Sequence, residues 1–540
     1  MSSFGWSGNL RKAASQQKAI IVRIFLILAA LTFSKVGAAQ VYFNIQIDWA
    51  QNFEFLDGAA LMPDGKVFLV GGEENYGPFH QTTLLVQMND EGQLLWAKSF
   101  LPVGNASGNT SSMLQIGGEI IIEGNYSVPV ANTSNFQIFL SKLDGTTGNL
   151  IWTKEFGQLN IADNAKRVIA TTDGGFAMGG WAFPDNNLQR PKFLLLKTDS
   201  IGNLLFRKEF TTDSSKDHYA YSITETSDSG FLLIGFRSYY GPCLGCLLQE
   251  HKNDLVLIKT DATGNEQWAK VYPSDEWKQR LFYSLDLQPL PNGDFLMAGL
   301  KGYAVYQPGN AYVAKYFLAR INALGEFVDS VTLDKNYYFF RINRLKAASD
   351  GNFWAFGAER DTITEGQTAV MMKITPALEV LWKREYRVSP PESTMHEVFY
   401  EGVEMPDHGF VLCGGAHGPL QDSTYANGWV IRVDSLGCLE PGCQLNSAIE
   451  DPPAAEQDIG ISLSPNPTSG QATLALTHEG AVLLGVRVLD VQGRVVSDMQ
   501  FLRAAGWREW VLDLGGEPAG VYVVWVRTSE GWATKKIIKQ

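Results

Sequence analysis

The sequence predicts an all-β protein in which a seven-bladed β-propeller, closed by an N-terminal strand, precedes a small β-sandwich. Three observations predict it. A ten-residue pattern recurs seven times, a turn-linked pair of strands follows most copies, and the last 80 residues carry a different strand pattern. Because 540 residues exceed what one ordinary core holds, two or more domains are expected.

The recurring pattern opens on a turn residue and closes seven positions later on a glycine, as in "DSGFLLIG" (228–235). The four residues before that glycine are apolar without alternation, as in "FLLI" (231–234), which indicates a strand covered on both faces. Asp or Asn before Gly or Ser favours a turn, and the closing glycine allows a bulge or a close backbone approach. The opening residues are Asp64, Gly117, Asp173, Asp228, Asn292, Asp350 and Asp407; the closing glycines are Gly71, Gly124, Gly180, Gly235, Gly299, Gly357 and Gly414.

A second motif follows, as in "FLLLKTDSIGNLLFRKEF" (193–210), where two strands flank an Asp-opened, Gly-containing turn. One further strand precedes each decapeptide, so a unit has about four antiparallel strands. Four strands per unit with both faces apolar are typical of propeller blades, which must stack to bury those faces. The strand after the turn carries a recurring aromatic residue expected to pack between blades: Trp96, Trp152, Phe206, Trp268, Phe327 and Trp382.

The two ends of the repeat array complement each other. The seventh unit begins its hairpin at "GWVIRVDSLG" (428–437) but lacks the aromatic strand. The alternating segment "VYFNIQI" (41–47) supplies a spare strand. We therefore predict that residues 41–47 complete the seventh blade and close the ring, which removes the free sheet edges.

The N-terminus is expected to be a secretory signal peptide, residues 1–39. Basic residues precede an apolar run at 24–33, and small residues follow in "VGAAQ". A start codon assigned too early would explain the long basic region. We expect the propeller at 40–443 and a polar, Pro-containing linker at 444–460, with no membrane-spanning segment in the mature chain.

The last residues, 461–540, read as short strands separated by turns, which favours a β-sandwich. Their motifs resemble the type A C-terminal sorting domain of the type IX secretion system, which is found in the Bacteroidetes. The residues that carry this resemblance are Pro465, Asn466, Pro467, Gly470, Asp490, Gly493, Arg494, Pro518, Gly520, Tyr522, Lys535 and Lys536. The resemblance implies an immunoglobulin-like fold, export across the outer membrane, and removal by a sorting protease. The protein would then be secreted or held at the outer-membrane surface; the alternative is a sandwich domain that is retained.

The five cysteines leave alternatives open. Cys438 and Cys443 enclose the turn "LEPG", so a local disulfide is our favoured pairing. Cys243 and Cys246 form a single "CLGC" pair, for which a loop disulfide is preferred over a metal or redox site because a structural zinc site needs a second pair. Cys413 falls in an apolar strand and is expected to be an inert thiol.

The sequence assigns no catalytic, cofactor-binding or metal-binding residue, and no cofactor is expected. The seven histidines are scattered, the turn aspartates are explained by turn chemistry, and the net charge of −13 argues against nucleic acid. We expect a binding or structural module for an unknown glycan or protein; the alternative is a propeller-type enzyme such as a polysaccharide hydrolase or lyase. Acids with raised pKa would favour the enzyme. The non-repeating aromatic ligand candidates are Trp181, Tyr239, Tyr240, Tyr303, Tyr306, Tyr312 and Tyr425.

Overall fold

The computed structural model describes residues 42–540 with gaps at 48–52, 75–80, 104–107, 131–132, 158–160, 185–189, 243–248, 274–280, 306–310, 334–339, 361–365, 389–394, 418–425, 440–460, 477–482, 491–494, 501–507 and 529–530. In this part of the chain the regular structure is β-strand throughout, and no helix is long and apolar enough to cross a membrane. The chain divides into two compact units, Met1–Ser435 and Leu436–Gln540. The expected signal peptide and linker lie outside the described residues.

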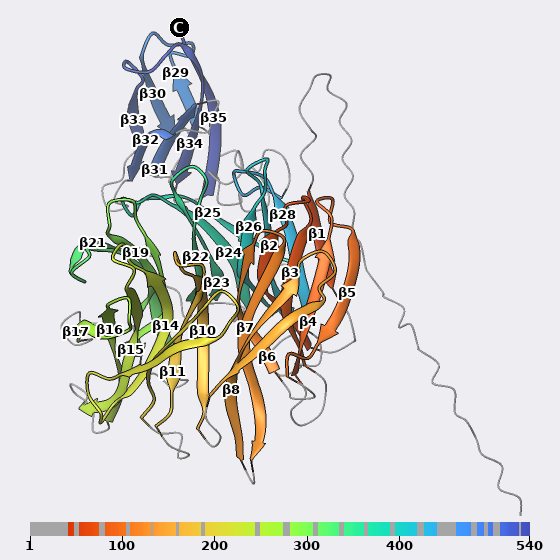
Figure 1. Ribbon diagram of the computed structural model, residues 1–540. Helices are drawn as coiled ribbons and strands as arrows, with labels where there is room; N and C mark the ends of the chain where they lie inside the picture. Colours follow the sequence, from red (N-terminus) through yellow and green to blue (C-terminus); the bar gives the residue numbers. More distant parts are fainter. Residues whose placement is uncertain are drawn as a thin grey trace, which may run out of the picture. The chain divides into compact units, whose positions relative to one another are not determined.

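The first unit is built from four-stranded antiparallel groups that resemble propeller blades (Figure 1). Four of these groups are separate sheets. They are β6 (Gly108–Ile116), β7 (Glu119–Val130), β8 (Thr133–Asp144) and β9 (Leu150–Phe156); β10 (Asp163–Ala170), β11 (Phe176–Ala182), β12 (Lys192–Thr198) and β13 (Leu204–Phe210); β14 (Asp217–Glu225), β15 (Phe231–Pro242), β16 (Gln249–Thr260) and β17 (Glu266–Tyr272); and β18 (Leu281–Pro289), β19 (Phe295–Val305), β20 (Ala311–Ile321) and β21 (Phe327–Thr332).

The remaining strands of this unit form one twelve-stranded sheet that breaks into three similar groups. They are β2 (Phe53–Leu61), β3 (Val67–Glu74), β4 (Gln81–Met88) and β5 (Leu94–Phe100); β22 (Phe340–Ala347), β23 (Phe353–Arg360), β24 (Gln367–Ile374) and β25 (Val380–Tyr386); and β26 (His396–Glu404), β27 (Phe410–His417) and β28 (Ala426–Val433) with β1 (Phe43–Ile47). Only one-residue parallel bridges, Phe53 to Ala426 and Gln367 to His396, join the three groups.

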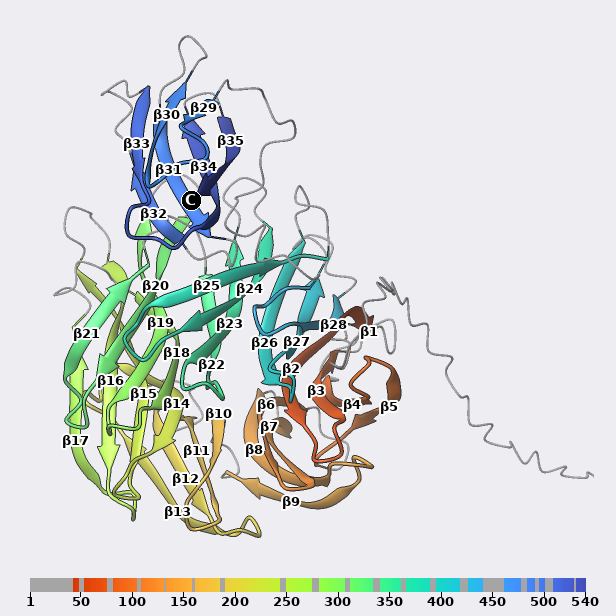
Figure 2. The ribbon, with the colours of Figure 1, turned by 90° about the horizontal axis from the view of Figure 1, so that it is seen from above.

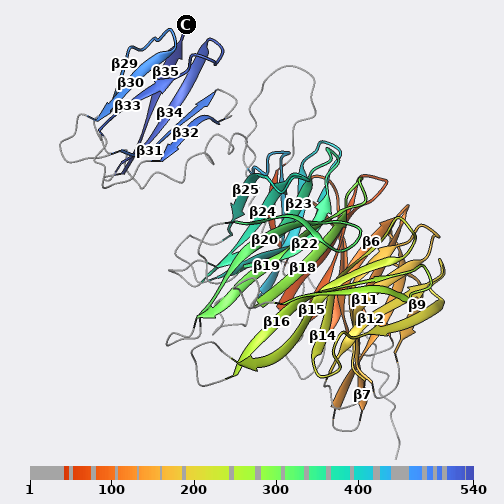
Figure 3. The same ribbon diagram turned by 90° about the vertical axis from the view of Figure 1, so that its left-hand side faces the viewer.

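The groups pack side by side through their first strands (Figure 2). Contacts run from β2 to β6, β10, β14, β18, β22 and β26 in turn, and β26 contacts β2. Figure 3 shows β18 to β20 beside β22 to β24. The apolar second strands are buried as their composition predicts: residues 231–234 are at most 1% exposed. One face of each second strand packs against the preceding group, and the other face packs against the following group.

The N-terminal strand β1 pairs antiparallel with β28, as the spare-strand argument predicts. Its buried residues Phe43, Ile45 and Ile47 alternate with half-buried ones. Phe43 pairs with Arg432, whereas Trp96 of β5 pairs with Gln87 at the corresponding point of β4. Residues 43–47 therefore take the place of the missing aromatic strand.

The glycine that closes the ten-residue pattern lies against the backbone of the first strand of its group. At Gly180, an added Cβ would lie 2.0 Å from the carbonyl oxygen of Asn164 on the first strand. Next to that contact the β10–β11 register shifts between Ala165 and Arg167, so Lys166 is a β-bulge residue. The same approach occurs at Gly71, Gly124, Gly235 and Gly414, with 1.8–2.1 Å to a first-strand carbonyl. Glycine is needed here because the bulge brings two backbones together.

The hairpin turn of each group packs on the aromatic strand of its neighbour. Gly148 has a φ of +63°, and an added Cβ would lie 2.5 Å from the Trp96 ring. Trp96 Nε1 donates to the Thr146 carbonyl at 3.2 Å, and Lys98 Nζ donates to Thr147 O at 2.6 Å. The turn glycine Gly92 meets Phe43 of β1 in the same way, which adds a second contact between the first and last groups.

The second unit contains two antiparallel sheets around one core. One holds β29 (Ile461–Ser464), β30 (Gln471–Leu476) and β33 (Glu509–Asp513); the other holds β31 (Leu483–Asp490), β32 (Val495–Gln500), β34 (Gly520–Thr528) and β35 (Gly531–Lys539). Leu474 of the first sheet and Val488, Val524 and Ile537 of the second are buried in a shared cluster. The arrangement is the two-layer sandwich that the strand pattern predicts; the immunoglobulin-like topology stays a prediction.

Candidate functional site

Bulges on the first strands of six groups each leave one side chain partly exposed at the edge of the packed sheet. The residue before each bulge is buried, but the bulge residue keeps some exposed surface. A bulge re-aims a side chain in this way at many functional sites. We call these the bulge residues: Asp57, Ser111, Lys166, Tyr221, Asn343 and Tyr400. They come from the first strands of six of the seven groups, so chemically different side chains stand at equivalent points of these strands.

The residues after the bulges tie the first strands together. Asp286 of β18 accepts a hydrogen bond from Ser222 of β14 at 2.6 Å and forms an ion pair with Arg167 of β10 at 3.6 Å. Arg344 of β22 pairs with Glu401 of β26 at 2.9 Å. Because β10 and β18 belong to groups separated by a third one, these side chains meet across the interior. Polar side chains of the first strands therefore contact one another between groups, including groups that are not adjacent along the chain.

Beside this paired network lie three charged groups without close partners of opposite charge. Glu123 of β7 is fully buried, and neither carboxylate oxygen has a hydrogen-bond partner. Lys166 and Asp57 interact with it electrostatically, but no ion pair within 4.0 Å joins Lys166 to an acid among the described residues. Asp57 accepts one hydrogen bond from Thr110 at 3.1 Å. We call Asp57, Glu123 and Lys166 the inner acid–lysine cluster.

Burial perturbs the pKa of all three members of this cluster. Desolvation is the main reason that the pKa of Glu123 is raised to about 8; Lys166 opposes this shift and the nearby Asp57 adds to it. Desolvation likewise raises the pKa of Asp57 to about 8 despite the Thr110 hydrogen bond. Desolvation lowers the pKa of Lys166. Groups poised in this manner are typical of sites that exchange protons or bind polar ligands.

An aromatic cluster lies next to Lys166. Its ammonium sits 5.4 Å from the ring centroid of Trp181, one of the aromatic ligand candidates predicted from the sequence. Trp181 meets Tyr219 edge-on at 5.2 Å and Tyr221 at 6.2 Å. All three rings keep some exposed surface. The cluster therefore offers aromatic faces beside charged groups.

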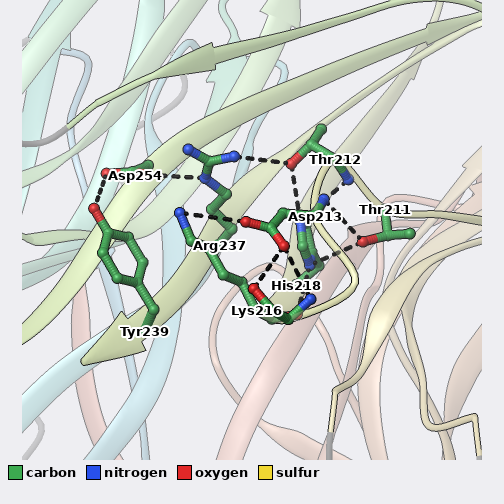
Figure 4. A network of polar contacts seen from close by, with 9 residues as sticks. Thr211, Thr212, Asp213, Lys216, His218, Arg237, Tyr239 and Asp254 are labelled. Carbon is green, nitrogen blue, oxygen red and sulfur yellow. Dashed lines mark hydrogen bonds and ion pairs between the residues drawn. The ribbon is translucent and has the colours of Figure 1, made fainter. Parts of the chain in front are cut away.

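A second polar network surrounds His218 (Figure 4). The histidine is fully buried, its Nδ1 donates to the Lys216 carbonyl at 3.0 Å, and its Nε2 accepts from the Thr212 backbone nitrogen at 3.3 Å. These two bonds require the neutral ring, and desolvation accordingly lowers the pKa of His218. Both ring nitrogens are occupied, so His218 fixes the segment before β14 and has no free atom for a ligand.

The same network holds Tyr239, another predicted ligand candidate. Arg237 pairs with Asp254 at 2.9 Å and donates to Thr212 at 3.5 Å, and the Tyr239 hydroxyl donates to Asp254 at 3.3 Å. The neighbouring Tyr240 is 70% exposed. Tyr306 and Tyr425 lie outside the described residues, as do the side chains of Tyr303 and Tyr312.

Turn chemistry accounts for the recurring aspartates. Asp199 Oδ1 accepts from the backbone nitrogens of Ile201 at 3.0 Å and Asn203 at 2.8 Å, and Asp261 accepts from Thr263 and Asn265 in the same way. Within the described ranges, no group of three or more His, Cys, Asp or Glu residues is arranged to hold a metal ion.

The cysteines remain partly outside the described structure. Cys413 is a buried free thiol, as expected from its strand. Cys438 is buried and disulfide-bonded. Its predicted partner Cys443 lies outside the described residues, as do Cys243 and Cys246.

In the second unit, the predicted sorting-motif residues cluster at the ends of strands. The Asn466 side chain donates to Lys536 O at 2.6 Å and accepts from the Ile538 nitrogen at 2.9 Å, which fixes the last strand. The Tyr522 hydroxyl donates to Pro518 O at 2.6 Å. Lys535 and Lys536 are exposed on β35, whereas Gly493 and Arg494 lie outside the described residues.

Sequence reasoning assigned no role to Lys539, the penultimate residue of the sequence. Its ammonium is buried and donates to the carbonyls of Leu514 at 2.6 Å and Gly515 at 3.0 Å, and to that of Glu517. Three carbonyl partners compensate for the loss of hydration. In the sequence, Lys539 lies two positions after Ile537 and so shares its face of the strand. A lysine at such a position is usually exposed, so its burial could not be predicted.

Comparisons with known proteins identify the second unit. Residues 462–540 match the family described as the secretion system C-terminal sorting domain. No curated protein sequence matches the chain.

Solved structures resemble the chain only distantly. A protein of unknown function from Dyadobacter fermentans is 10% identical, with a TM-score of 0.38, over 72% of this chain and 98% of that one. The β-propeller domain of the Trilobed protease from Pyrococcus furiosus is 9% identical, with a TM-score of 0.35, over 70% and 93%. An alpha-L-arabinofuranosidase from Fusarium graminearum is 11% identical, with a TM-score of 0.37, over 73% and 98%. At these values the similarities carry no argument about activity. The assignment comes from the C-terminal motifs and the family match together: residues 462–540 are a secretion system C-terminal sorting domain.

Proposed function

We propose that the chain is a protein of the type IX secretion pathway whose first unit is a closed seven-bladed β-propeller that binds an extracellular glycan or protein. The sorting domain at residues 462–540 is the observation that carries the proposal, because such a tail implies export. The predicted partners are the secretion machinery and its sorting protease. The mature protein would be secreted or held at the outer-membrane surface.

Two contacts support the closed seven-bladed arrangement. The β1–β28 pairing fills the place of the fourth strand in the last group. The contact of β26 with β2 continues the series of first-strand contacts from the last group to the first. A closed ring leaves no group with an uncovered apolar face.

The bulge residues support binding as the role of the first unit. They present carboxyl, hydroxyl, ammonium, amide and phenol groups from the first strands of six groups. Such varied polar groups close to aromatic rings are typical of ligand sites.

A propeller-type enzyme is the second candidate. The raised pKa values of Asp57 and Glu123 favour it, because a carboxylic acid protonated near neutral pH serves as a general acid. A glycosidase also needs a second, ionised carboxylate across the substrate. Turnover of a polysaccharide by the purified chain, abolished in both Asp57→Asn and Glu123→Gln, would establish this alternative.

The export proposal is tested by deleting residues 461–540 and fractionating the producing cells. The truncated protein should accumulate in the periplasm, while the full chain reaches the surface or the medium. Normal surface delivery of the truncated protein would refute the proposed address. Mass spectrometry of the exported protein should show cleavage near residues 444–460, and an intact chain would mean that the tail is retained.

A further inference from the structure

We propose that an exposed apolar surface on the second and third groups of the first unit joins two copies of the chain in a two-fold symmetric dimer. The surface comprises the start of β9 and the hairpin that leads into β13. These are the fourth strands of neighbouring groups and lie at the outer edge of the unit (Figure 2). Five aliphatic side chains, 47–58% exposed, form what we call the outer apolar patch: Leu150, Ile151, Ile201, Leu204 and Leu205.

The hairpin before β13 lies against β9, which brings the patch residues of the two groups together. At Gly202, in the turn of this hairpin, an added Cβ would lie 2.8 Å from the Trp152 ring. The Lys154 ammonium donates to Asn203 Oδ1 at 3.0 Å. These turn residues lie between patch residues of the hairpin, and Trp152 directly follows the patch residues of β9. The patch therefore spans the boundary between the two groups.

The fourth group shows that the fold does not require aliphatic side chains at these positions. Its turn and its outer strand have the same aspartate-centred hydrogen bonds and the same bulge as those of the third group. Polar residues nevertheless replace the aliphatic ones: Thr263 stands in place of Ile201, Glu266 in place of Leu204 and Gln267 in place of Leu205. Packing within the chain therefore does not explain the patch. Contiguous exposed apolar surface of this kind marks interaction sites.

The charges around the patch disfavour a lipid surface as its partner. Surfaces that enter a lipid interface commonly carry free Lys or Arg at their border. Here Lys154 and Lys208 each donate to an asparagine of the next turn, at 3.0 and 3.1 Å. Glu155 and Glu209 are exposed beside them. The net charge of −13 would add repulsion from an anionic membrane.

A second copy of the chain suits the patch. In a two-fold contact the same surface meets itself, so it has to be self-complementary. The patch meets this requirement because its centre is aliphatic and basic and acidic residues alternate at its border. Its five side chains expose on the order of 400 Å², so two copies would bury roughly 800 Å² of apolar surface. With a surrounding polar rim, such a contact reaches the lower limit of stable interfaces, about 1,200 Å². We therefore expect a weak, reversible dimer with a micromolar Kd.

Sedimentation velocity of the purified exported chain at several concentrations tests the proposal. We expect monomers and dimers in a concentration-dependent equilibrium. Leu205→Asp should weaken dimerisation by about 10-fold or more, because the charge enters the contact once from each copy. Leu381→Asp is the matched control, since Leu381 is 46% exposed at the same bulge position of β25 in the sixth group, outside the patch.

Leu205→Gln is a second variant that should fold, because the fourth group carries Gln267 at the same position; melting temperatures verify the folding of every variant. Weaker dimerisation of both Leu205 variants, with the control unchanged, supports the proposal. A chain that stays monomeric at every concentration overturns it, as does a dimer that the Leu205 variants leave unchanged or that Leu381→Asp weakens equally. A monomeric chain that floats with neutral or anionic vesicles, and loses this ability in Leu205→Asp, would assign the patch to lipid and refute the dimer. Export and ligand binding are measured separately, so the proposed function does not depend on these outcomes.

Discussion

At the scale of single residues, the recurring glycines connect the repeat pattern to the candidate site. Gly180 lies on β11, yet its effect appears on β10, where Lys166 is turned out of the sheet. A side chain at position 180 would collide with the backbone that forms the bulge. The repeat therefore encodes a bulge on each first strand, although no bulge residue is itself part of the repeated pattern.

Gly180→Ala should lower the free energy of unfolding by roughly 1–3 kcal/mol, because the added methyl would press on the Asn164 carbonyl. Chemical unfolding followed by tryptophan fluorescence measures the change. Gly118→Ala is the matched control, since an added Cβ there meets nothing within 4 Å. Equal stability of the two variants would contradict the close-approach argument.

Glu123 predicts a pH dependence of stability. Its pKa is about 8 in the fold against an ordinary value of 4.5, so the folded protein holds a proton that the unfolded chain releases. Stability is therefore lost as pH rises from about 4.5 to about 8. Lys166 opposes this shift and Asp57 strengthens it.

Glu123→Gln should consequently stabilise the protein by roughly 1–4 kcal/mol above about pH 8, and the gain should shrink toward about pH 4. Chemical unfolding of both proteins across this range checks the prediction. A variant less stable than the original chain at high pH would show that Glu123 is ionised and paired in the fold.

Sequence alone reached part of the candidate site. Trp181 was selected because it breaks the repeat, and it lies beside Lys166. Lys166 and Glu123 gave no such signal, because a charged residue in a strand is usually solvated and a one-residue register shift reverses which face it occupies. Asp57, Glu123 and Lys166 belong to three successive groups, so only the three-dimensional packing of these groups shows that the three side chains are close.

At the scale of elements, the contact between an aromatic strand and the next hairpin turn is the recurring joint of the first unit. Trp96 covers Gly148, Trp152 covers Gly202 and Trp268 covers Gly325. The sequence motif predicted packing between neighbouring groups correctly. It misaligned one member: Asp329, two residues after Phe327, pairs with Arg320 at the position where Trp268 pairs with Lys259.

Trp96→Ala should lower the free energy of unfolding by roughly 2–4 kcal/mol, because it opens a cavity and removes the hydrogen bond to Thr146. Leu95→Ala on the same strand should change it by less than about 0.5 kcal/mol, since Leu95 is 45% exposed. Differential scanning calorimetry compares the two. If Leu95→Ala lowered the free energy of unfolding more than Trp96→Ala, the contact with the next group would involve the other face of β5.

Strand β1 should contribute as much to the stability of the folded protein as a strand inside any other group. Ile45→Asp places a charge in the cluster that contains Val430 and should cost roughly 3–5 kcal/mol or cause aggregation. Gln46→Ser on the half-buried face should change stability by less than about 0.5 kcal/mol. Thermal unfolding with light scattering measures both effects, and an unchanged Ile45→Asp variant would mean that β1 is dispensable.

At the scale of the whole molecule, the repeat length and the two-sided burial of the second strands were sufficient to predict the blade-like sheets. The C-terminal motifs were sufficient to predict the sorting domain, now matched at residues 462–540. The number of blades and the ligand lie beyond such patterns, because closure depends on how sheets turn relative to one another and binding depends on side chains from different groups. The contact from β26 to β2 is the structural basis for proposing a ring.

Hydrogen exchange on β28 tests that ring most directly. We expect the alternate backbone amides of residues 428–432 that point toward β1 to be protected in the chain that begins at residue 40 and to exchange rapidly in one that begins at residue 48. The amides of β11 should keep their protection in both chains, because β11 belongs to the third group and does not pair with β1. If the amides that point toward β1 exchange equally slowly without it, the N-terminal strand does not complete the last group and the closed propeller is wrong.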